Sequence, residues 1–284
     1  MRFVSYRKDE REGLAVRKGG DLLDLGSKSL LELLAEGPGA LAAVANSAGK
    51  ALDPAGLRFL PPISRPPKII CVGLNYVDHA AESPYKNVPD YPPFFPRFAS
   101  SLVGHDEAIL RPSESEQLDF EGELVAVIGR GGRRISRANA LDHVAGYSIF
   151  NDASIRDYQF KSPQWTVGKN FDGTGAFGPE FVTADELPRG AAGLRLETRL
   201  NGQVVQSADT HDLVFSVADL VFFASEVFTL EAGDVIVTGT PAGVGFARKP
   251  PLFMKDGDVC EIEIEGIGIL RNPIKDEPQA SIAA

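Results

Sequence analysis

The sequence predicts a mixed, β-rich α+β fold in which a small N-terminal α+β domain precedes a larger domain. Short β-branched apolar runs, separated by Gly, Pro and Asn, recur along most of the chain. A few segments with helical spacing interrupt them. A proline-rich stretch from Leu60 to Lys68 interrupts the pattern and reads as a boundary. We therefore expect a small domain over 1–60, a linker over 61–67 and the main domain over 68–284.

The small domain is predicted to combine a short sheet with two helices. The strings MRFVSYR and GLAVRKGGDLLDLG read as strands around a Gly-Gly turn. The string SLLELLAEGPGALAAVANSAG reads as helical segments that Gly-Pro-Gly interrupts.

The larger domain is predicted to be built mainly from strands. The strand-like strings are KIICVGLNY, ELVAVIGR, YSIFND, LRLETRLNG, DVIVTGTP and DVCEIEIEGIGILRN. Asn201-Gly202 is typical of a tight hairpin turn. Helical segments are expected at VDHAAE, RANALDHVA and THDLVFSVADLVFFASEVF.

Composition is that of a globular protein and limits the possible partners. Of 284 residues, 43% are hydrophobic and 24% charged, and no apolar run approaches the roughly 20 residues of a membrane span. The N-terminus lacks the apolar core of a secretory signal, so we expect a cytoplasmic protein without a membrane partner. The net charge of -10 argues against nucleic acid and requires a locally positive pocket for any anionic substrate. Cys71 and Cys260 have no paired spacing and are expected as buried thiols.

Three carboxylates form the candidate metal site. Glu121 and Glu123 are two apart at the start of a predicted strand, so their side chains point the same way. Asp152 ends another predicted strand and can lie beside them. Three such charges repel one another unless a cation sits between them, and oxygen ligands select Mg²⁺ or Mn²⁺ over zinc. On spacing alone, a solvated strand edge is the more usual explanation of the Glu-x-Glu pattern.

Five strings in this order closely resemble the catalytic domain of the fumarylacetoacetate hydrolase family. They are KIICVGLNYVDHAAE, LDFEGELVAVIG, GYSIFNDAS, WTVGKNFDGTGAFGP and DVIVTGTPAGVG, and the resemblance runs from about Lys68 to Pro273. It implies a β-roll fold, a homodimer, and Mg²⁺ or Mn²⁺ held by Glu121, Glu123 and Asp152. Residues 1–60 resemble the variable N-terminal region of bacterial members.

The resemblance also assigns catalytic roles. His79 and Glu82, three apart and on one face of a helix, match a pair that activates water within a lid over 78–93. Lys169 matches a lysine that reaches the metal site and stabilises a developing enolate. Without the resemblance, the pair reads as a surface ion pair and Lys169 as a solvated loop residue.

Substrate contacts are implied for four residues: Tyr76, Arg97, Gly239 and Thr240. The last two lie in a Gly-rich turn that can offer hydroxyl and amide donors to a carboxylate, although an ordinary turn after a buried strand has the same sequence. Arg97 departs from the family pattern, in which a lysine followed by prolines is common, so the substrate can differ. The aromatic loop Ser83–Pro93 is expected to shape the pocket entrance.

The predicted activity is metal-dependent hydrolysis of a C–C bond in a small 2-oxo or 1,3-dioxo carboxylate such as an acylpyruvate, fumarylacetoacetate or a 2,4-dioxo sugar acid. The metal would polarise a carbonyl, and His79, oriented by Glu82, would deprotonate the attacking water. The same site suits oxaloacetate decarboxylation, dienoate isomerisation and sugar-acid dehydration. A non-catalytic binding protein of the same fold is the alternative from another class.

Overall fold

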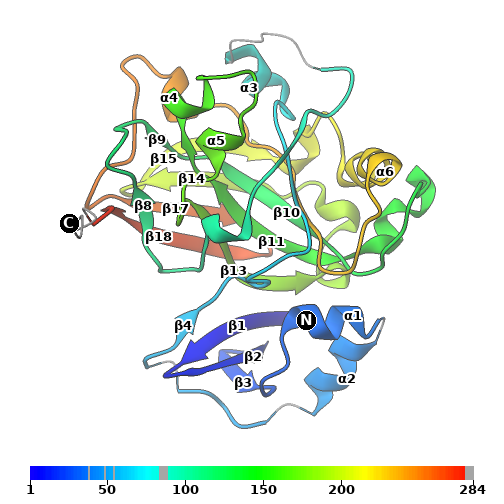
Figure 1. Cartoon of the computed structure of the whole chain (residues 1–284). Helices are drawn as coiled ribbons and strands as arrows, with labels where there is room; N and C mark the ends of the chain where they lie inside the picture. Colours follow the sequence, from blue (N-terminus) through cyan, green and yellow to red (C-terminus); the bar gives the residue numbers. More distant parts are fainter. Residues whose placement is uncertain (38, 48, 54, 83–88, 279–284) are drawn as a thin grey trace, which may run out of the picture.

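The computed structural model describes residues 1–37, 39–47, 49–53, 55–82 and 89–278, which form two large sheets and a small one (Figure 1). The eleven-stranded sheet has the order β3-β2-β1-β13-β11-β10-β16-β5-β6, with β4 paired to β1 and β7 to β13. The five-stranded sheet has the order β15-β14-β17-β18-β8, and β12 pairs with β9.

The strands of the large sheet are β1 (Arg2–Lys8), β2 (Arg11–Lys18), β3 (Asp21–Asp24), β4 (Arg58–Phe59), β5 (Ile69–Val72), β6 (Phe94–Pro96), β7 (Leu102–Val103), β10 (Gly122–Ile128), β11 (Val144–Asp152), β13 (Gly175–Thr183) and β16 (Val235–Val237). The other strands are β8 (Ile109–Arg111), β9 (Leu118–Asp119), β12 (Ser154–Ile155), β14 (Arg195–Leu200), β15 (Gln203–Asp209), β17 (Val259–Ile264) and β18 (Gly268–Asp276).

The α-helices are short, and the longest is α6. They are α1 (Leu30–Ala35), α2 (Ala40–Asn46), α3 (Val77–Glu82), α4 (Arg156–Gln159), α5 (Thr166–Lys169) and α6 (Val217–Val227). The 3-10 segments are η1 (Ala99–Ser101), η2 (Arg137–His143), η3 (Ala184–Glu186), η4 (Arg189–Ala191), η5 (Thr210–Asp212) and η6 (Gly245–Ala247). In the part of the chain that the structure describes, no helix is long and apolar enough to cross a membrane.

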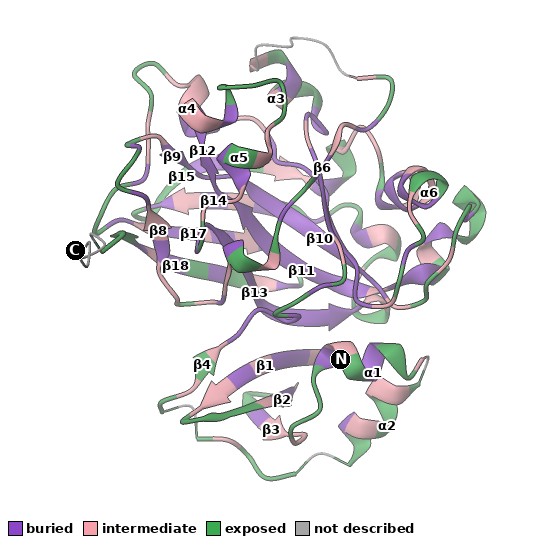
Figure 2. Cartoon of the chain, in the orientation of Figure 1, coloured by how far each residue is buried: buried purple, intermediate pink, exposed green. Residues whose placement is uncertain are grey.

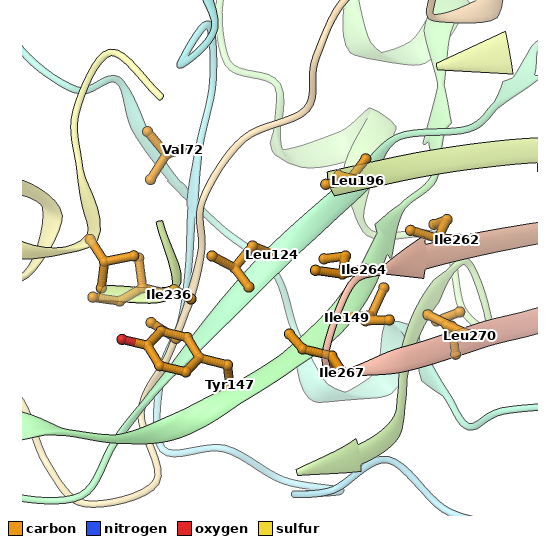
Figure 3. Packing of buried hydrophobic residues seen from close by; sticks show 14 of the residues in the cluster. Val72, Leu124, Tyr147, Ile149, Leu196, Ile236, Ile262, Ile264, Ile267 and Leu270 are labelled. Carbon is orange, nitrogen blue, oxygen red and sulfur yellow. The ribbon is translucent and has the colours of Figure 1, made fainter. Parts of the chain in front are cut away.

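Strands β10 and β11 are buried on both faces, and their alternation positions the site (Figure 2). Leu124 of β10 and Ile149 of β11 belong to the core shared with the five-stranded sheet, which also contains Ile262 and Leu270 (Figure 3). The residues that alternate with these along the two strands, such as Val125, belong to the second core on the opposite face of the sheet. Because side chains alternate along a strand, Glu121, Glu123 and Asp152 belong to this second face.

The N-terminal unit adds strands to the same sheet. Strand β1 pairs with β13 through Arg2 opposite Val182 and Phe3 opposite Phe181. The second core contains Phe3 and residues of α1 together with residues of β10, β11 and β13. Arg17 forms an ion pair with the buried Glu180 across the same junction. The boundary at 61–67 stays a prediction, but the two units share hydrogen bonds and a core.

Most predicted elements are confirmed. The Gly-Gly turn between β2 and β3, the helices α1 and α2, and the main strands all form where the pattern indicated. Asn201 and Gly202 have positive φ angles of 52° and 77° and join β14 to β15, as the hairpin signal indicated. Cys71 and Cys260 are buried free thiols. The nine-residue strand β13 was not predicted, and RANALDH is a 3-10 segment.

Candidate metal centre and active site

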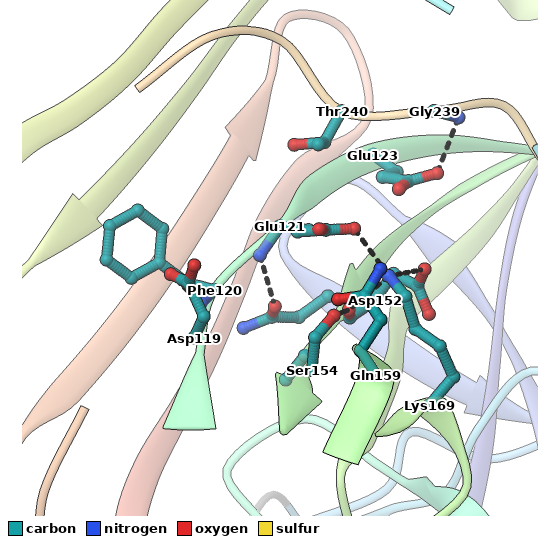
Figure 4. A network of polar contacts seen from close by, with 12 residues as sticks. Asp119, Phe120, Glu121, Glu123, Asp152, Ser154, Gln159, Lys169, Gly239 and Thr240 are labelled. Atoms are coloured by element: carbon teal, nitrogen blue, oxygen red, sulfur yellow. Dashed lines mark hydrogen bonds and ion pairs between the residues drawn. The ribbon is translucent and has the colours of Figure 1, made fainter. Parts of the chain in front are cut away.

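Glu121, Glu123 and Asp152 meet at one end of the paired strands β10 and β11. A carboxylate oxygen from each lies within 4.8 Å of those of the other two, and all three residues are buried (Figure 4). The convergence follows from the fold, because Gly122 pairs with Asn151 and so places Asp152 beside the start of β10. The backbone N–H of Asp152 donates to the carbonyl of Glu121 at 2.9 Å. The predicted convergence is therefore confirmed.

Lys169 neutralises part of this acidic cluster. Its Nζ lies 2.7 Å from Oε2 of Glu121 and 2.6 Å from Oδ2 of Asp152, and its side chain is 2% exposed. The carboxylates of Asp152 and Glu121 raise the pKa of Lys169, although burial opposes its charge. The short helix α5 ends at Lys169. Gly168 lets this helix pack closely against Gln159, because a Cβ added at Gly168 would lie 2.4 Å from the backbone nitrogen of Gln159.

Arg156 and Gln159, on helix α4, were not predicted. Arg156 donates through Nε to Asp119 at 2.8 Å and through Nη1 to Glu121 at 2.7 Å. Its Nη2 is buried and has no hydrogen-bond partner among the described residues, although Arg156 lines the pocket. A buried unpaired guanidinium nitrogen is costly, so this donor is well suited to an anionic ligand.

Asp119 was part of a predicted motif but had no predicted role. Besides the ion pair with Arg156, it accepts hydrogen bonds from the backbone N–H groups of Gly245 and Phe246, both at 2.8 Å. It thereby fixes the segment that follows the Gly-rich turn against Arg156. The sequence signal was an acidic residue two before Glu121, which spacing alone cannot separate from the other carboxylates.

The buried charges leave an acidic excess. Four buried carboxylates, those of Asp119, Glu121, Glu123 and Asp152, meet three buried cations, those of Arg97, Arg156 and Lys169. Burial alone would raise the pKa of Glu121, but Lys169 and Arg156 outweigh it and lower that pKa to about 2. Burial and the neighbouring charges of Asp152 and Glu121 raise the pKa of Glu123 well above its usual range. Glu123 is thus the carboxylate whose charge is least compensated.

A divalent cation fits this donor set. Three buried carboxylates within 4.8 Å of one another provide hard oxygen ligands, and the excess negative charge favours a cation between them. With all carboxylates ionised, a divalent ion would leave one positive charge in excess, which suits an anionic substrate. The arrangement is consistent with a divalent metal site.

His79 and Glu82 on helix α3 lie in the wall of the same pocket. His79 Nδ1 is 3.2 Å from Oε1 of Glu82, and the Glu82 carboxylate also accepts the backbone N–H of Gly243 at 3.0 Å. If Nδ1 carries the proton that it donates to Glu82, the proton acceptor of the ring is Nε2. Glu82 thereby orients the imidazole and docks α3 on the Gly-rich turn.

The residues predicted to contact the substrate lie in different surroundings. Thr240 lines the pocket, although its hydroxyl accepts from Gln206 and donates to the carbonyl of Gly122. The N–H of Gly239 donates to Glu123 at 2.5 Å. The Arg97 side chain is fully buried and bonds Asp152, and it lines a different pocket.

Tyr76 is buried, and its hydroxyl has no hydrogen-bond partner among the described residues. The substrate roles of all four residues stay predictions. The predicted lid over 78–93 and the entrance loop Ser83–Pro93 lie partly outside the described residues, because 83–88 are not described.

The chain belongs to the fumarylacetoacetate hydrolase family. The family model "Fumarylacetoacetate (FAA) hydrolase C-terminal" matches residues 68–275. Among curated proteins, the chain is 40% identical over 293 residues to the mitochondrial oxaloacetate tautomerase fahd2 of Xenopus laevis, covering 96% of this chain and 90% of the relative. It is 39% identical over 290 residues to the mitochondrial oxaloacetate tautomerase FAHD2A of Homo sapiens, covering 96% and 91%.

Solved structures confirm the fold. The fumarylacetoacetate hydrolase of Exiguobacterium antarcticum superposes with a TM-score of 0.87 at 39% identity, covering 98% of this chain and all of that one. The 5-carboxymethyl-2-hydroxymuconate delta-isomerase of Mycobacterium smegmatis gives 0.79 at 31%, with the same coverage. A maleylpyruvate hydrolase of Sphingobium sp. SYK-6, in complex with manganese(II) and pyruvate, gives 0.79 at 26%, again over 98% and all of that chain. Relatives therefore include tautomerases, isomerases and hydrolases. This chain is a family member whose buried Glu121, Glu123 and Asp152 are consistent with a divalent metal site.

Proposed function

We propose that the chain is a divalent-metal-dependent tautomerase of small 2-oxo acids. The observation that carries the proposal is the His79–Glu82 pair, which lines the same pocket as the buried carboxylates and the unpaired Nη2 of Arg156. Enolisation of a 2-oxo acid requires a proton acceptor, a hydrogen-bond donor for the carboxylate, and a cation that stabilises the enolate. The similarity to oxaloacetate tautomerases over 96% of the chain supports this reaction and makes oxaloacetate the first substrate to test.

A Mg²⁺ or Mn²⁺ ion held by Glu121, Glu123 and Asp152 would polarise the 2-oxo carbonyl. The chain's own residues supply the rest of the reaction. Arg156 Nη2 binds the substrate carboxylate, and Lys169 stabilises the negative charge that develops on the 2-oxo oxygen. His79 Nε2 takes a proton from C3, and the C–H electron pair forms the C2–C3 double bond. The π pair of the 2-oxo carbonyl moves to its oxygen, which takes a proton from water to give the enol, and the His79 imidazolium returns its proton to the solvent.

Replacement of His79 tests this role directly. We expect His79→Ala to slow exchange of the C3 protons of oxaloacetate with deuterium by roughly 100-fold or more, because a positioned base is removed. Binding of Mn²⁺, measured by calorimetry, is expected to be retained. The matched control is His211→Ala, since His211 is exposed and outside this pocket. Wild-type exchange rates in His79→Ala would exclude His79 as the base.

Hydrolysis of a C–C bond is the second candidate, and the same pair favours it. Nε2 of His79, with Glu82 behind it, can take a proton from water instead of from carbon, and the water then attacks the carbonyl beyond C3. Release of pyruvate from an acylpyruvate such as 2,4-dioxopentanoate, followed by NMR, distinguishes the two reactions. A chain that exchanges C3 protons but releases no pyruvate is a tautomerase; release at the rate of exchange would establish the hydrolase.

A further inference from the structure

The pocket has a second half that the proposed chemistry does not use. Besides the charged and polar groups, its lining includes four aromatic side chains, here called the aromatic wall: Phe95, Phe160, Trp165 and Phe246. Val72 and Val244 extend the same apolar surface. The wall is continuous with the site, because the Lys169 ammonium lies 5.2 Å from the centre of the Phe95 ring.

The aromatic wall is held in place by specific packing. Phe95 and Trp165 meet edge to face with ring centres 5.4 Å apart, and Phe160 and Phe246 lie 5.1 Å apart. Trp165 lies against Gly73, where an added Cβ would come within 2.3 Å of the indole ring, so only glycine leaves room for it. The backbone of Phe246 is fixed by its hydrogen bond to Asp119.

The charges around the pocket decide what the wall can bind. Among the described residues that line it, the Lys and Arg side chains are those of Lys169 and Arg156, and both already pair with Glu121. The remaining donor of Arg156 is needed for the substrate carboxylate. A second carboxylate placed against the rings would lose its hydration without gaining a cation, whereas an alkyl or aryl group would be stabilised by burial.

We infer that the aromatic wall is a subsite for the substituent that a 2-oxo acid carries at C3, and that this substituent is apolar, an alkyl chain or a single ring. This inference rests on the proposed function and names its substrate class. The chain then differs from a strict oxaloacetate enzyme, because the dicarboxylate gains nothing from the wall.

Trp165 provides the test, because it is the single tryptophan of the chain and part of the aromatic wall. Its fluorescence is titrated, with and without Mg²⁺, with pyruvate, 2-oxobutanoate, 2-oxopentanoate, 2-oxohexanoate and oxaloacetate. Each buried methylene is expected to tighten binding by about fourfold, and oxaloacetate is expected to bind less tightly than 2-oxohexanoate. The same order is expected in the KM values for deuterium exchange at C3.

Variants separate this subsite from general stability. Phe246→Ala is expected to reduce the gain per methylene, because it removes a ring of the wall while the backbone contact to Asp119 remains. Phe98→Ala is the matched control, since Phe98 is 53% exposed and does not line this pocket. Phe98→Ala is expected to keep the full gain in affinity per methylene.

The outcomes also separate this inference from the proposed function. If pyruvate binds and exchanges but longer chains gain nothing, or if Phe246→Ala keeps the gain, the apolar subsite is wrong and the tautomerase remains. If exchange rates show the gain but Trp165 fluorescence does not respond, the substituent lies elsewhere and the subsite is again wrong. If no 2-oxo acid binds or exchanges, both proposals fail.

Discussion

Lys169 contributes the charge that most directly balances the acidic cluster, since its Nζ contacts Glu121 and Asp152 together. Removing one partner of a buried ion pair leaves the other charge uncompensated, at a cost of about 3–5 kcal/mol. We expect Lys169→Met to lose about that much stability in urea without metal. Because the cluster is then more acidic, saturating Mg²⁺ should restore more stability to the variant than it adds to the wild type.

Lys255→Met is the control for this prediction, because Lys255 is exposed and distant from the pocket lining. It should unfold like the wild type with and without Mg²⁺. An equal Mg²⁺ increment in Lys169→Met and in the wild type would show that Lys169 does not compensate the metal-binding carboxylates.

At the same scale, some site residues could be predicted from the sequence and others could not. The Glu121-x-Glu123 spacing predicted that both side chains point the same way, because the alternation of side chains is fixed along a strand. The family resemblance then singled out this pair and Asp152 as metal ligands. Arg156 could not be predicted in this way. It reaches the site only because helix α4 follows the short pairing of β12 with β9, a tertiary contact that no local pattern encodes.

At the scale of the elements, the turn after β16 links the His79–Glu82 pair to the large sheet. Gly243 has a φ of 102°, an added Cβ would lie 2.3 Å from the carbonyl oxygen of Val205, and its N–H binds Glu82. Gly243→Ala combines an unfavourable backbone conformation with a steric clash, and we expect a loss of about 2–5 kcal/mol in urea unfolding. Deuterium exchange at C3 should slow as well, because Glu82 and His79 lose their anchor.

Gly202→Ala is the matched control, since Gly202 also has a positive φ, 77°, but no atom lies within 4 Å of its added Cβ. It should cost about 1–2 kcal/mol and leave exchange unchanged. Equal losses in the two variants would mean that the contact with Val205 contributes nothing.

The prediction of strands failed where pairing with neighbouring strands, and not the local sequence, determines the structure. The string of β13, GAFGPEFVT, contains two glycines and a proline and does not resemble a strand. It forms one because β11 pairs along one edge and β1 along the other. A side chain at Gly175 would crowd this part of β13, because an added Cβ would lie 3.0 Å from Arg97 and from Phe150. By contrast, β10 contains the apolar run LVAVI and β11 the strand-like string YSIFND, which is why they were predicted.

For the whole molecule, the shared sheet and core predict that the N-terminal unit and the rest of the chain unfold together. Phe3 is fully buried, pairs with Phe181 of β13 and packs 6.3 Å from its ring. Trp165 reports only on the active-site end, whereas far-UV circular dichroism reports on all strands and helices. We expect both signals to change at one urea concentration, which is the signature of a two-state transition.

Phe3→Ala should lower the free energy of unfolding measured by both signals by about 3–5 kcal/mol, because a cavity opens in a core to which both units contribute. Phe98→Ala removes an exposed phenylalanine and should change neither of these free energies of unfolding by more than about 0.5 kcal/mol. If Phe3→Ala instead produced an early phase in circular dichroism while the Trp165 transition stayed in place, residues 1–60 would be an independently unfolding domain. The β1–β13 pairing would then join two separate cooperative units, with the predicted linker at 61–67 as the boundary between them.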